Sequence, residues 1–432
     1  MKLLTRVLIL LFIISFCFST ISCGKREEIP EGKTVIKVAY WGSPEEIEII
    51  TETINEWQKT HPDIYVKLEH TPGSDYVNKL LTRIAGGEPP DVAFMEVNIF
   101  VTFSYKDVFL DLKPFIKNDP EFNLNEFFPE VVDRFRVDGG VYAIPRDTAP
   151  FACVYYNKSL FDAAGVPYPT NNWNWNDLID KAQKLTKTDE QGRPIQYGFY
   201  AWAWQNFVYF NGGKLVDKVK NPTKCLLDEP EAVEGLQMFQ DLYHKYKVSP
   251  TPTDVSNMGM DSNKMFMAGR LAMYSSGIWE TPVLRKITSF DWDVAMFPKG
   301  PKGKRGFGTG GSGYTILKYT KHPKEAWEVV KALAADKGQI MLAETGLAQP
   351  ANKIIAEGPY WAGSKKQPLN KGMLNEAVKY VTYDPFHINW REIQDLYIYP
   401  QMDLLYNGDI NAQEFCDNIV PEIDKMLHKT EE

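Results

Sequence analysis

The chain has 432 residues, of which 44% are hydrophobic, so it can bury a large core and should form two to three domain-sized units. Lys and Arg together number 48 against 56 Asp and Glu, a formal net charge of −8, and no long basic run occurs. This balance argues against nucleic acid as a partner. Aromatic residues make up 13% of the chain, which is more than its core requires and suits a surface that stacks on a ligand.

The N-terminal residues 1–23 form a separate module. Lys2 and Arg6 supply a positive start, and residues 7–18 form an apolar run that is shorter than the roughly 20 residues that a transmembrane helix needs. This pattern predicts a signal peptide. It ends in Thr-Ile-Ser-Cys-Gly, which resembles a bacterial lipobox, and the resemblance implies that Cys23 is acylated and becomes the first residue. An ordinary signal peptidase cut, with Cys23 as a bystander, stays open.

A polar stretch follows this module, and residues 24–33 are expected to form a flexible tether. A lipid on Cys23 would hold the protein at the extracytoplasmic side of a bacterial membrane, in the periplasm or at the outer surface, while the body stays in water.

The body of the chain contains three cysteines, Cys153, Cys225 and Cys416. They show neither a CxxC motif nor a His/Cys spacing typical of metal ligands. We therefore expect no metal, no cofactor and no dense disulfide framework, although one disulfide stays open.

The first part of the body alternates between strand and helix patterns. Residues 34–40 and 64–69 are β-rich, and residues 91–95 form a buried strand. Between them, residues 45–61 carry apolar side chains at helical spacing, and residues 75–85 predict a second helix. This βαβαβ order implies a parallel sheet covered by helices.

Five short motifs then occur in a characteristic order. They are Trp41-Gly42 after the first strand, Gly-Gly-Glu-Pro-Pro-Asp-Val at residues 86–92, Tyr-Ala-Ile-Pro at 142–145, Tyr-Tyr-Asn-Lys at 155–158, and Gly-Arg-Leu-Ala-Met leading to Gly-Ile-Trp over 269–279. In this order they resemble the extracellular solute-binding proteins of sugar ABC importers, the maltose-binding-protein-like family. The resemblance implies an α/β, two-lobed periplasmic-binding-protein fold (type II), in which each lobe is a mainly parallel sheet flanked by helices.

The same resemblance implies how the chain divides. Residues 34–147 plus 314–346 would form the N-terminal lobe, and residues 148–313 plus 347–432 the C-terminal lobe. A monomer of this kind would close around a mono- or oligosaccharide in the cleft between the lobes and deliver it to ABC permease subunits in the membrane. The chain would cross between the lobes near Asp147, Gly310 and Gly346.

The stretch 265–280 carries the most telling aromatic residue. A buried helix should end before Gly269, and residues 271–274 should form a short strand that Ser-Ser-Gly then breaks. Trp279 would thus be carried to the crevice beyond the strand end. Composition alone favours a core role for Trp279, whereas the resemblance implies a platform on which a sugar stacks.

Other candidates come from the ends of predicted strands and from the family pattern. Asp147 matches an acidic sugar ligand of the family, and Glu96 and Asn98 follow the strand 91–95. Met95 stands where the maltose-binding pattern has a stacking Trp, so another sugar is favoured. The candidate ligand-binding residues are Trp41, Glu96, Asn98, Asp147, Trp202, Trp204, Trp279, Gly311, Ser312 and Trp390.

Several of these residues have an alternative interpretation. Trp202 and Trp204 follow a predicted strand and match a loop that contacts sugar in the family, but packing inside the second lobe is equally open. Gly311 and Ser312 lie in a glycine-rich stretch that either faces the cleft or forms a plain turn. Trp173 and Trp175, which precede a predicted helix, are expected to be structural.

A glycoside hydrolase would also combine carboxylates with aromatic side chains. However, no pair of acidic residues stands out at successive strand ends, and neither a GxSxG elbow nor an HExxH motif occurs. We therefore expect a binding protein and no enzyme. A structural lipoprotein and a binding protein for a non-sugar solute stay open as alternatives.

Overall fold

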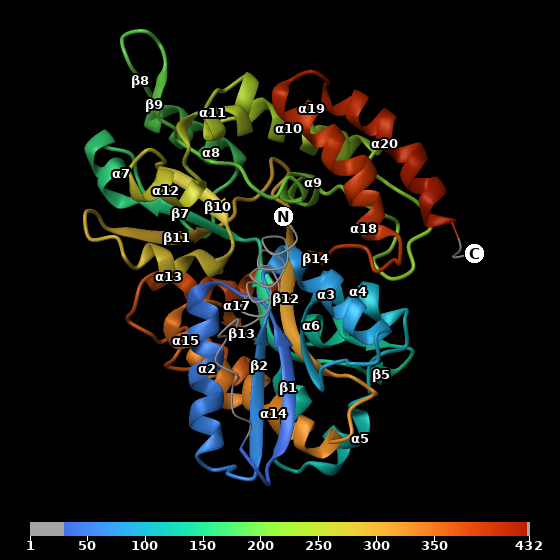
Figure 1. The fold of residues 1–432 in the computed structure, drawn as a ribbon. Helices are drawn as coiled ribbons and strands as arrows, with labels where there is room; N and C mark the ends of the chain where they lie inside the picture. Colours follow the sequence, from blue (N-terminus) through green and yellow to red (C-terminus); the bar gives the residue numbers. More distant parts are fainter. Residues whose placement is uncertain (1–29, 430–432) are drawn as a thin grey trace, which may run out of the picture.

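The computed structural model describes residues 30–429. The predicted signal peptide, the lipidation site Cys23 and the tether up to residue 29 lie outside this range. The described part forms two lobes, which Figure 1 shows one above the other, and this confirms the predicted two-lobed α/β fold. None of the helices between residues 30 and 429 is both long enough and apolar enough to cross a membrane.

The first lobe is built on a seven-stranded sheet with the order β13-β6-β12-β3-β1-β2, to which β14 adds by pairing with β12. β1 pairs in parallel with β2 and β3, as the βαβαβ pattern predicted, whereas β12 runs antiparallel to β3 and β6. The strands are β1 (Thr34–Tyr40), β2 (Ile64–His70), β3 (Val92–Glu96), β6 (Ile144–Pro150), β12 (Phe307–Ile316), β13 (Gln349–Pro350) and β14 (Val381–Tyr383).

Helices cover this sheet, with α2, α14 and α15 packed against one another beside it (Figure 1). Local sequence explains where α2 begins, because the Ser43 side chain accepts a hydrogen bond from the Glu46 amide and Pro44 occupies the first turn. The helices are α2 (Pro44–Gln58), α3 (Gly73–Ala85), α4 (Val97–Ser104), α5 (Lys113–Asn118), α6 (Pro129–Arg134), α14 (Pro323–Ala334), α15 (Asp336–Thr345) and α16 (Lys353–Glu357).

The second lobe has a three-stranded sheet with the order β10-β7-β11, formed by β7 (Cys153–Asn157), β10 (Met273–Ser276) and β11 (Trp292–Met296). Both pairings are antiparallel, so this sheet differs from the mainly parallel one that was expected. The connections agree with the antiparallel pairing of β7 with β11, because β7 follows β6 of the first lobe and β11 precedes β12 of that lobe.

Most of the remaining helices surround this second sheet, and α10, α19 and α20 pack against one another (Figure 1). The expected structural role of Trp173 and Trp175 is confirmed, since both are buried and the capping box of Asn174 starts α8 between them. The helices are α7 (Lys158–Ala164), α8 (Trp175–Leu185), α9 (Gln205–Asn211), α10 (Pro230–His244), α11 (Pro252–Met258), α12 (Ser262–Met267), α13 (Thr281–Leu284), α17 (Leu374–Ala377), α18 (Trp390–Ile393), α19 (Tyr399–Asn407) and α20 (Ala412–Leu427).

One local expectation is corrected, and one open alternative is decided. Ser275 and Ser276 do not break a strand but form the end of β10, because they pair with Val154 and Cys153 of β7. For the glycine-rich stretch the structure excludes the alternative of a plain turn, because this stretch is part of the ten-residue strand β12. Gly313 fits there because an added Cβ would lie 2.4 Å from the carbonyl oxygen of Ile144 on the neighbouring strand.

The predicted lobe boundaries fall inside paired strands. β6 and β12 pair from Pro150 and Thr309 to Ile144 and Tyr314. Residues 148–150 of β6 and 309–313 of β12, which were assigned to the C-terminal lobe, therefore belong to the large sheet of the other lobe. β13 also joins this sheet, although residues 347–432 were assigned to the other lobe. The three cysteines of the described chain, Cys153, Cys225 and Cys416, are buried free thiols.

Candidate functional site

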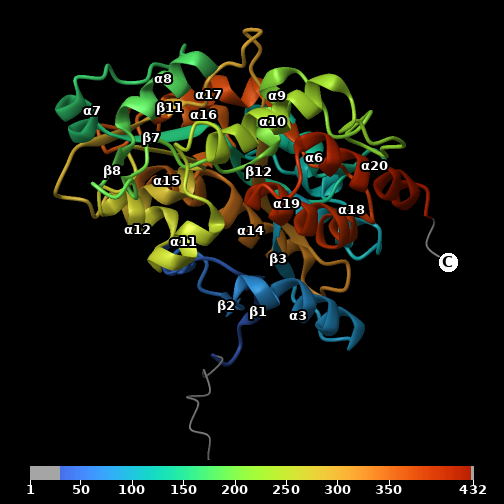
Figure 2. The same ribbon diagram turned by 90° about the horizontal axis from the view of Figure 1, so that it is seen from above.

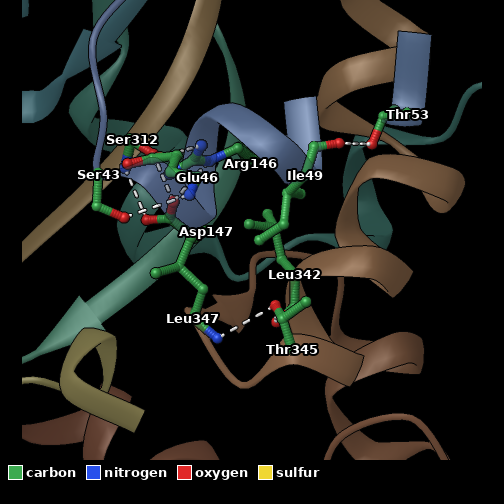
Figure 3. Close-up of polar contacts among 10 residues, drawn as sticks. All are labelled: Ser43, Glu46, Ile49, Thr53, Arg146, Asp147, Ser312, Leu342, Thr345 and Leu347. Atoms are coloured by element: carbon green, nitrogen blue, oxygen red, sulfur yellow. Dashed lines mark hydrogen bonds and ion pairs between the residues drawn. The ribbon is translucent and has the colours of Figure 1, made fainter. Parts of the chain in front are cut away.

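A buried network of charges lies where β6, β12 and the first turn of α2 meet. Arg146 Nη1 donates to Glu46 Oε1 at 2.6 Å, and its Nε donates to Asp147 Oδ2 at 2.9 Å. Figure 3 shows the Arg146 side chain between these two carboxylates. The guanidinium also lies 4.7 Å from the centre of the Phe94 ring. Because all three charged side chains are nearly buried, each depends on the others to offset its loss of water.

Strand register brings Asp147, Ser312 and Glu96 to the same level of the sheet. Ser312 pairs with Asp147 on one side and with Glu96 on the other. The Ser312 amide donates to Asp147 Oδ1 at 3.0 Å, and its hydroxyl donates to Oδ2. The adjacent Gly311 has φ +144°, and an added Cβ there would meet Val131 at 3.2 Å. The structure thus brings four predicted residues together.

The pKa values of Glu96 and Arg146 are both raised, but for different reasons. Burial raises the pKa of Glu96 to about 7, and the nearby carboxylates of Glu46 and Asp147 add to this effect. Burial lowers the pKa of Arg146, but the same two carboxylates outweigh it and raise that pKa above its ordinary value. Arg146 therefore remains a cation, while Glu96 changes its protonation near neutral pH.

Aromatic side chains of the second lobe form a second part of the site. The Trp279 and Trp202 rings are 5.6 Å apart and edge-on, and Phe151 lies 4.8 Å from Trp202 and 6.0 Å from Trp279. Trp279 Nε1 donates to Glu280 Oε1 at 3.1 Å, which fixes the indole plane. Both indoles are partly exposed, so they offer ring surface to a ligand.

Trp279 connects the two parts, because its ring packs against the apolar cluster of Ile49, Leu342 and Leu347. Ile49 lies on α2 one turn after Glu46, and Figure 3 shows the two residues on adjacent turns. The aromatic group of the second lobe therefore lies next to the charged network of the first lobe.

Two further predicted residues lie in the first lobe. Trp41 follows β1 and is partly buried, and its ring meets the Phe94 ring edge-on at 6.1 Å. Arg146 contacts the same Phe94 ring. Asn98 is exposed on α4, and its Nδ2 donates to Asp384 Oδ2 at 3.2 Å. Burial raises the pKa of Asp384.

Trp204 and Trp390 do not join this group. Trp204 is 7% exposed, with its ring edge-on to Phe415 of α20, and Trp390 is 5% exposed. Each leaves too little ring surface for a sugar to stack on. For Trp204 the structure supports the alternative of packing inside the second lobe.

The sequence interpretation missed Glu46, Arg146, Phe151 and Glu280. Glu46 fell inside the helix expected over residues 45–61, and Arg146 fell beside the lobe crossing expected near Asp147. Gly42 leaves room for the Glu46 side chain, because an added Cβ there would lie 2.6 Å from Glu46 Oε2, but this contact is visible only in the structure. Within residues 30–429 no group of three or more His, Cys, Asp or Glu side chains is arranged to hold a metal ion.

Comparisons with known proteins agree with this architecture. The chain is 26% identical over 266 residues to the arabinooligosaccharide-binding protein of Bacillus subtilis, and this alignment covers 58% of this chain and 55% of that protein. An ABC substrate-binding protein from Listeria monocytogenes, solved in complex with cycloalternan, superposes with a TM-score of 0.82 at 26% identity, over 92% of this chain and 100% of that one. Maltose-bound MalE3 of T. maritima gives a TM-score of 0.76 at 23% identity, over 91% of this chain and 100% of that one.

The sequence also matches a whole family profile. Residues 41–340, well over half of the chain, match the family described as bacterial extracellular solute-binding protein. This range contains the charged network and the aromatic group. The chain belongs to the bacterial extracellular solute-binding protein family.

Proposed function

We propose that this protein is the substrate-binding component of an ABC importer and captures a neutral sugar between its two lobes for delivery to the membrane permease. The observation that carries this proposal is the position of Trp279 and Trp202 beside the network of Glu46, Arg146 and Asp147. An indole face packs against the C–H side of a sugar ring, while carboxylates and backbone amides bind its hydroxyl groups. The cycloalternan, maltose and arabinooligosaccharide named for similar proteins support this ligand class.

The site is proposed to bind without catalysing a reaction. Glu46 and Asp147 are both held by Arg146, so neither carboxylate is free to act as a nucleophile. Glu96 has the raised pKa of a general acid, but a glycosidase needs a second, available carboxylate. Carboxylates that Arg146 holds in place in this way suit a site in which they accept hydrogen bonds from the hydroxyl groups of a sugar.

We propose further that Cys23 carries a lipid that holds a monomer on the extracytoplasmic side of the membrane. The support is the lipobox-like sequence ending at Cys23 and the extracellular family to which the chain belongs. Cells fed with labelled palmitate should label the wild-type protein, whereas Cys23→Ala should remain unlabelled. Labelling that persists in the variant would refute this assignment.

A thermal-shift screen of mono- and oligosaccharides, followed by calorimetric titration, tests the sugar assignment. A binding sugar should raise the melting temperature and alter tryptophan emission, because it stabilises the folded state and contacts two indoles. Trp279→Ala should weaken binding at least about tenfold, the equivalent of about 1.4 kcal/mol. Tyr319→Ala is the control, since that exposed ring follows the end of β12 away from the site.

Two results would overturn the proposal. One is a thermal shift with a peptide, polyamine or metal chelate and none with any saccharide. The other is steady release of reducing sugar from a glycan, which would establish an enzyme.

A further inference from the structure

The carboxylate of Glu280 is bonded to the indole of Trp279 and lies outside the charged network of the first lobe. Both residues belong to the short 3₁₀-helix Ile278–Glu280, which follows β10 after Gly277. Glu280 Oε1 accepts hydrogen bonds from Trp279 Nε1 at 3.1 Å and from the Ser276 hydroxyl at 2.8 Å. One carboxylate oxygen therefore ties the indole to the end of β10.

The other carboxylate oxygen of Glu280 is held by a second element, α12. Asn263 Nδ2 donates to Glu280 Oε2 at 2.6 Å, and Asn263 Oδ1 accepts from the Tyr274 hydroxyl at 2.8 Å. α12 packs against β10 and α13, on the side of the second lobe where Figures 1 and 2 both show α7. Tyr274 is fully buried, and this burial, followed by the charge of Glu280, raises the pKa of its hydroxyl, which therefore stays a donor. The network connects Glu280 to the core of the second lobe.

The backbone before Trp279 restricts where the indole ring can lie. An added Cβ at Gly277 would lie 1.9 Å from the ring, so the ring rests on bare backbone there. Trp202 and Phe151 meet the ring edge-on, at 5.6 and 6.0 Å between ring centres. These contacts confine the ring by apolar packing, while the bond to Glu280 fixes the direction of its N–H group.

The negative charge of Glu280 has a further effect on the indole. Among the described residues Glu280 has no ion-pair partner, and the N–H and O–H donors named above bind its carboxylate instead. A hydrogen bond to a carboxylate is stronger than one between neutral groups. A charge beside the N–H also adds electron density to the indole, whose negative faces attract the partly positive C–H groups of a sugar.

We propose that Glu280 is a positioning residue for sugar binding, which orients and polarises the Trp279 indole with the support of Asn263 and Tyr274. This inference rests on the proposed sugar-binding function. Glu280 acts through Trp279 and not by binding the sugar, because both of its carboxylate oxygens are bonded to donors of the protein. An indole that is already oriented needs no ordering when the sugar enters, which favours binding.

Calorimetric titration tests this role with the saccharide that gives the largest thermal shift, starting from maltotriose, mannotriose and arabinotriose. Glu280→Ala should lower the affinity by about three- to tenfold, the loss expected for one hydrogen bond. Glu280→Gln keeps an acceptor for the indole N–H but loses the charge, so it should restore part of the affinity. Glu190→Ala is the matched control, because it removes an exposed carboxylate from a turn of the same lobe, and it should bind like the wild type.

The indole itself is observed in proton–nitrogen correlation spectra of the sugar-free protein. The cross-peak that disappears in Trp279→Phe identifies Trp279 Nε1–H. Glu280→Ala should move this cross-peak upfield, because its proton loses the carboxylate, whereas Glu280→Gln should move it less and Glu190→Ala should leave it in place. Far-UV circular dichroism spectra that coincide with the wild type show that the variants fold.

Two outcomes would overturn the positioning role and leave the proposed function intact. One is an unchanged sugar affinity in Glu280→Ala. The other is a lower affinity with an unmoved Trp279 cross-peak, since the effect would then not pass through the indole. The absence of binding by every saccharide would instead overturn the proposed function and, with it, this role in sugar binding.

Discussion

Replacing Arg146 by Met removes the cation that forms ion pairs with two buried carboxylates, Glu46 and Asp147. The two ion pairs of Arg146 have N–O distances of 2.6 and 2.9 Å, and the three side chains are between 5% and 11% exposed. Breaking a buried pair while leaving its partner charged costs about 3–5 kcal/mol. The lost contact with the Phe94 ring adds about 0.5–2 kcal/mol. We therefore expect the free energy of unfolding to fall by at least about 3 kcal/mol.

Equilibrium unfolding in urea measures this loss, followed by tryptophan fluorescence and by far-UV circular dichroism so that coincident transitions can be verified. Arg193→Met is the matched control, because the Arg193 side chain is 75% exposed and its bridge to Asp189 should be worth less than about 1 kcal/mol. Adding Glu46→Gln to Arg146→Met should recover part of the loss, since it removes one uncompensated charge. If Arg146→Met costs no more than Arg193→Met, the charged network does not stabilise the fold as argued.

The remaining predictions concern protonation, backbone contact and capping. The pKa of Glu96 is about 7 in the folded protein, against 4.5 for an ordinary glutamate. The folded state therefore holds a proton that the unfolded state releases, and the free energy of unfolding should fall as the pH rises from about 4.5 to 7. Glu96→Gln should remove this decline and be more stable above pH 7 by up to about 3 kcal/mol, and an unchanged pH profile of urea midpoints would contradict this. Gly313→Ala should destabilise the fold by roughly 1–3 kcal/mol or more, because the added Cβ would clash with the Ile144 carbonyl. Gly310→Ala is the control, because the nearest atoms to its added Cβ would lie 3.7 Å away. Equal melting temperatures of the two variants would refute this prediction. Asn174→Ala should cost about 1 kcal/mol in the same urea assay by removing the cap of α8, and no change there would count against the capping box.

Local sequence signals predicted the elements of the first lobe well. The strand expected over residues 34–40 is β1 with the same bounds, and the helix expected over 45–61 ends three residues early at Gln58. These predictions succeed because apolar periodicity and capping residues act over a few positions. Local signals could not predict that the strands of the second sheet pair antiparallel, because strand orientation depends on how segments distant in the sequence come together.

The two indoles of the loop before α9 show the same limit. Trp202 and Trp204 are two residues apart and have the same chemistry, yet Trp202 is partly exposed beside Trp279 while Trp204 packs against Phe415. The difference follows from the fold around them, because α20 from the end of the chain covers only one of the two rings.

By itself, the sequence determined the element order, the family resemblance and the position of Trp279 after a short strand. Tertiary structure alone decided the charged network, because Asp147 and Ser312 are separated by 165 residues and meet only through the register of β6 and β12. A side chain's charge can be read from the sequence, but its burial and its partners depend on which distant strands and helices exclude water around it. For this reason Arg146 and Glu46 became recognisable as parts of the site only in the folded protein.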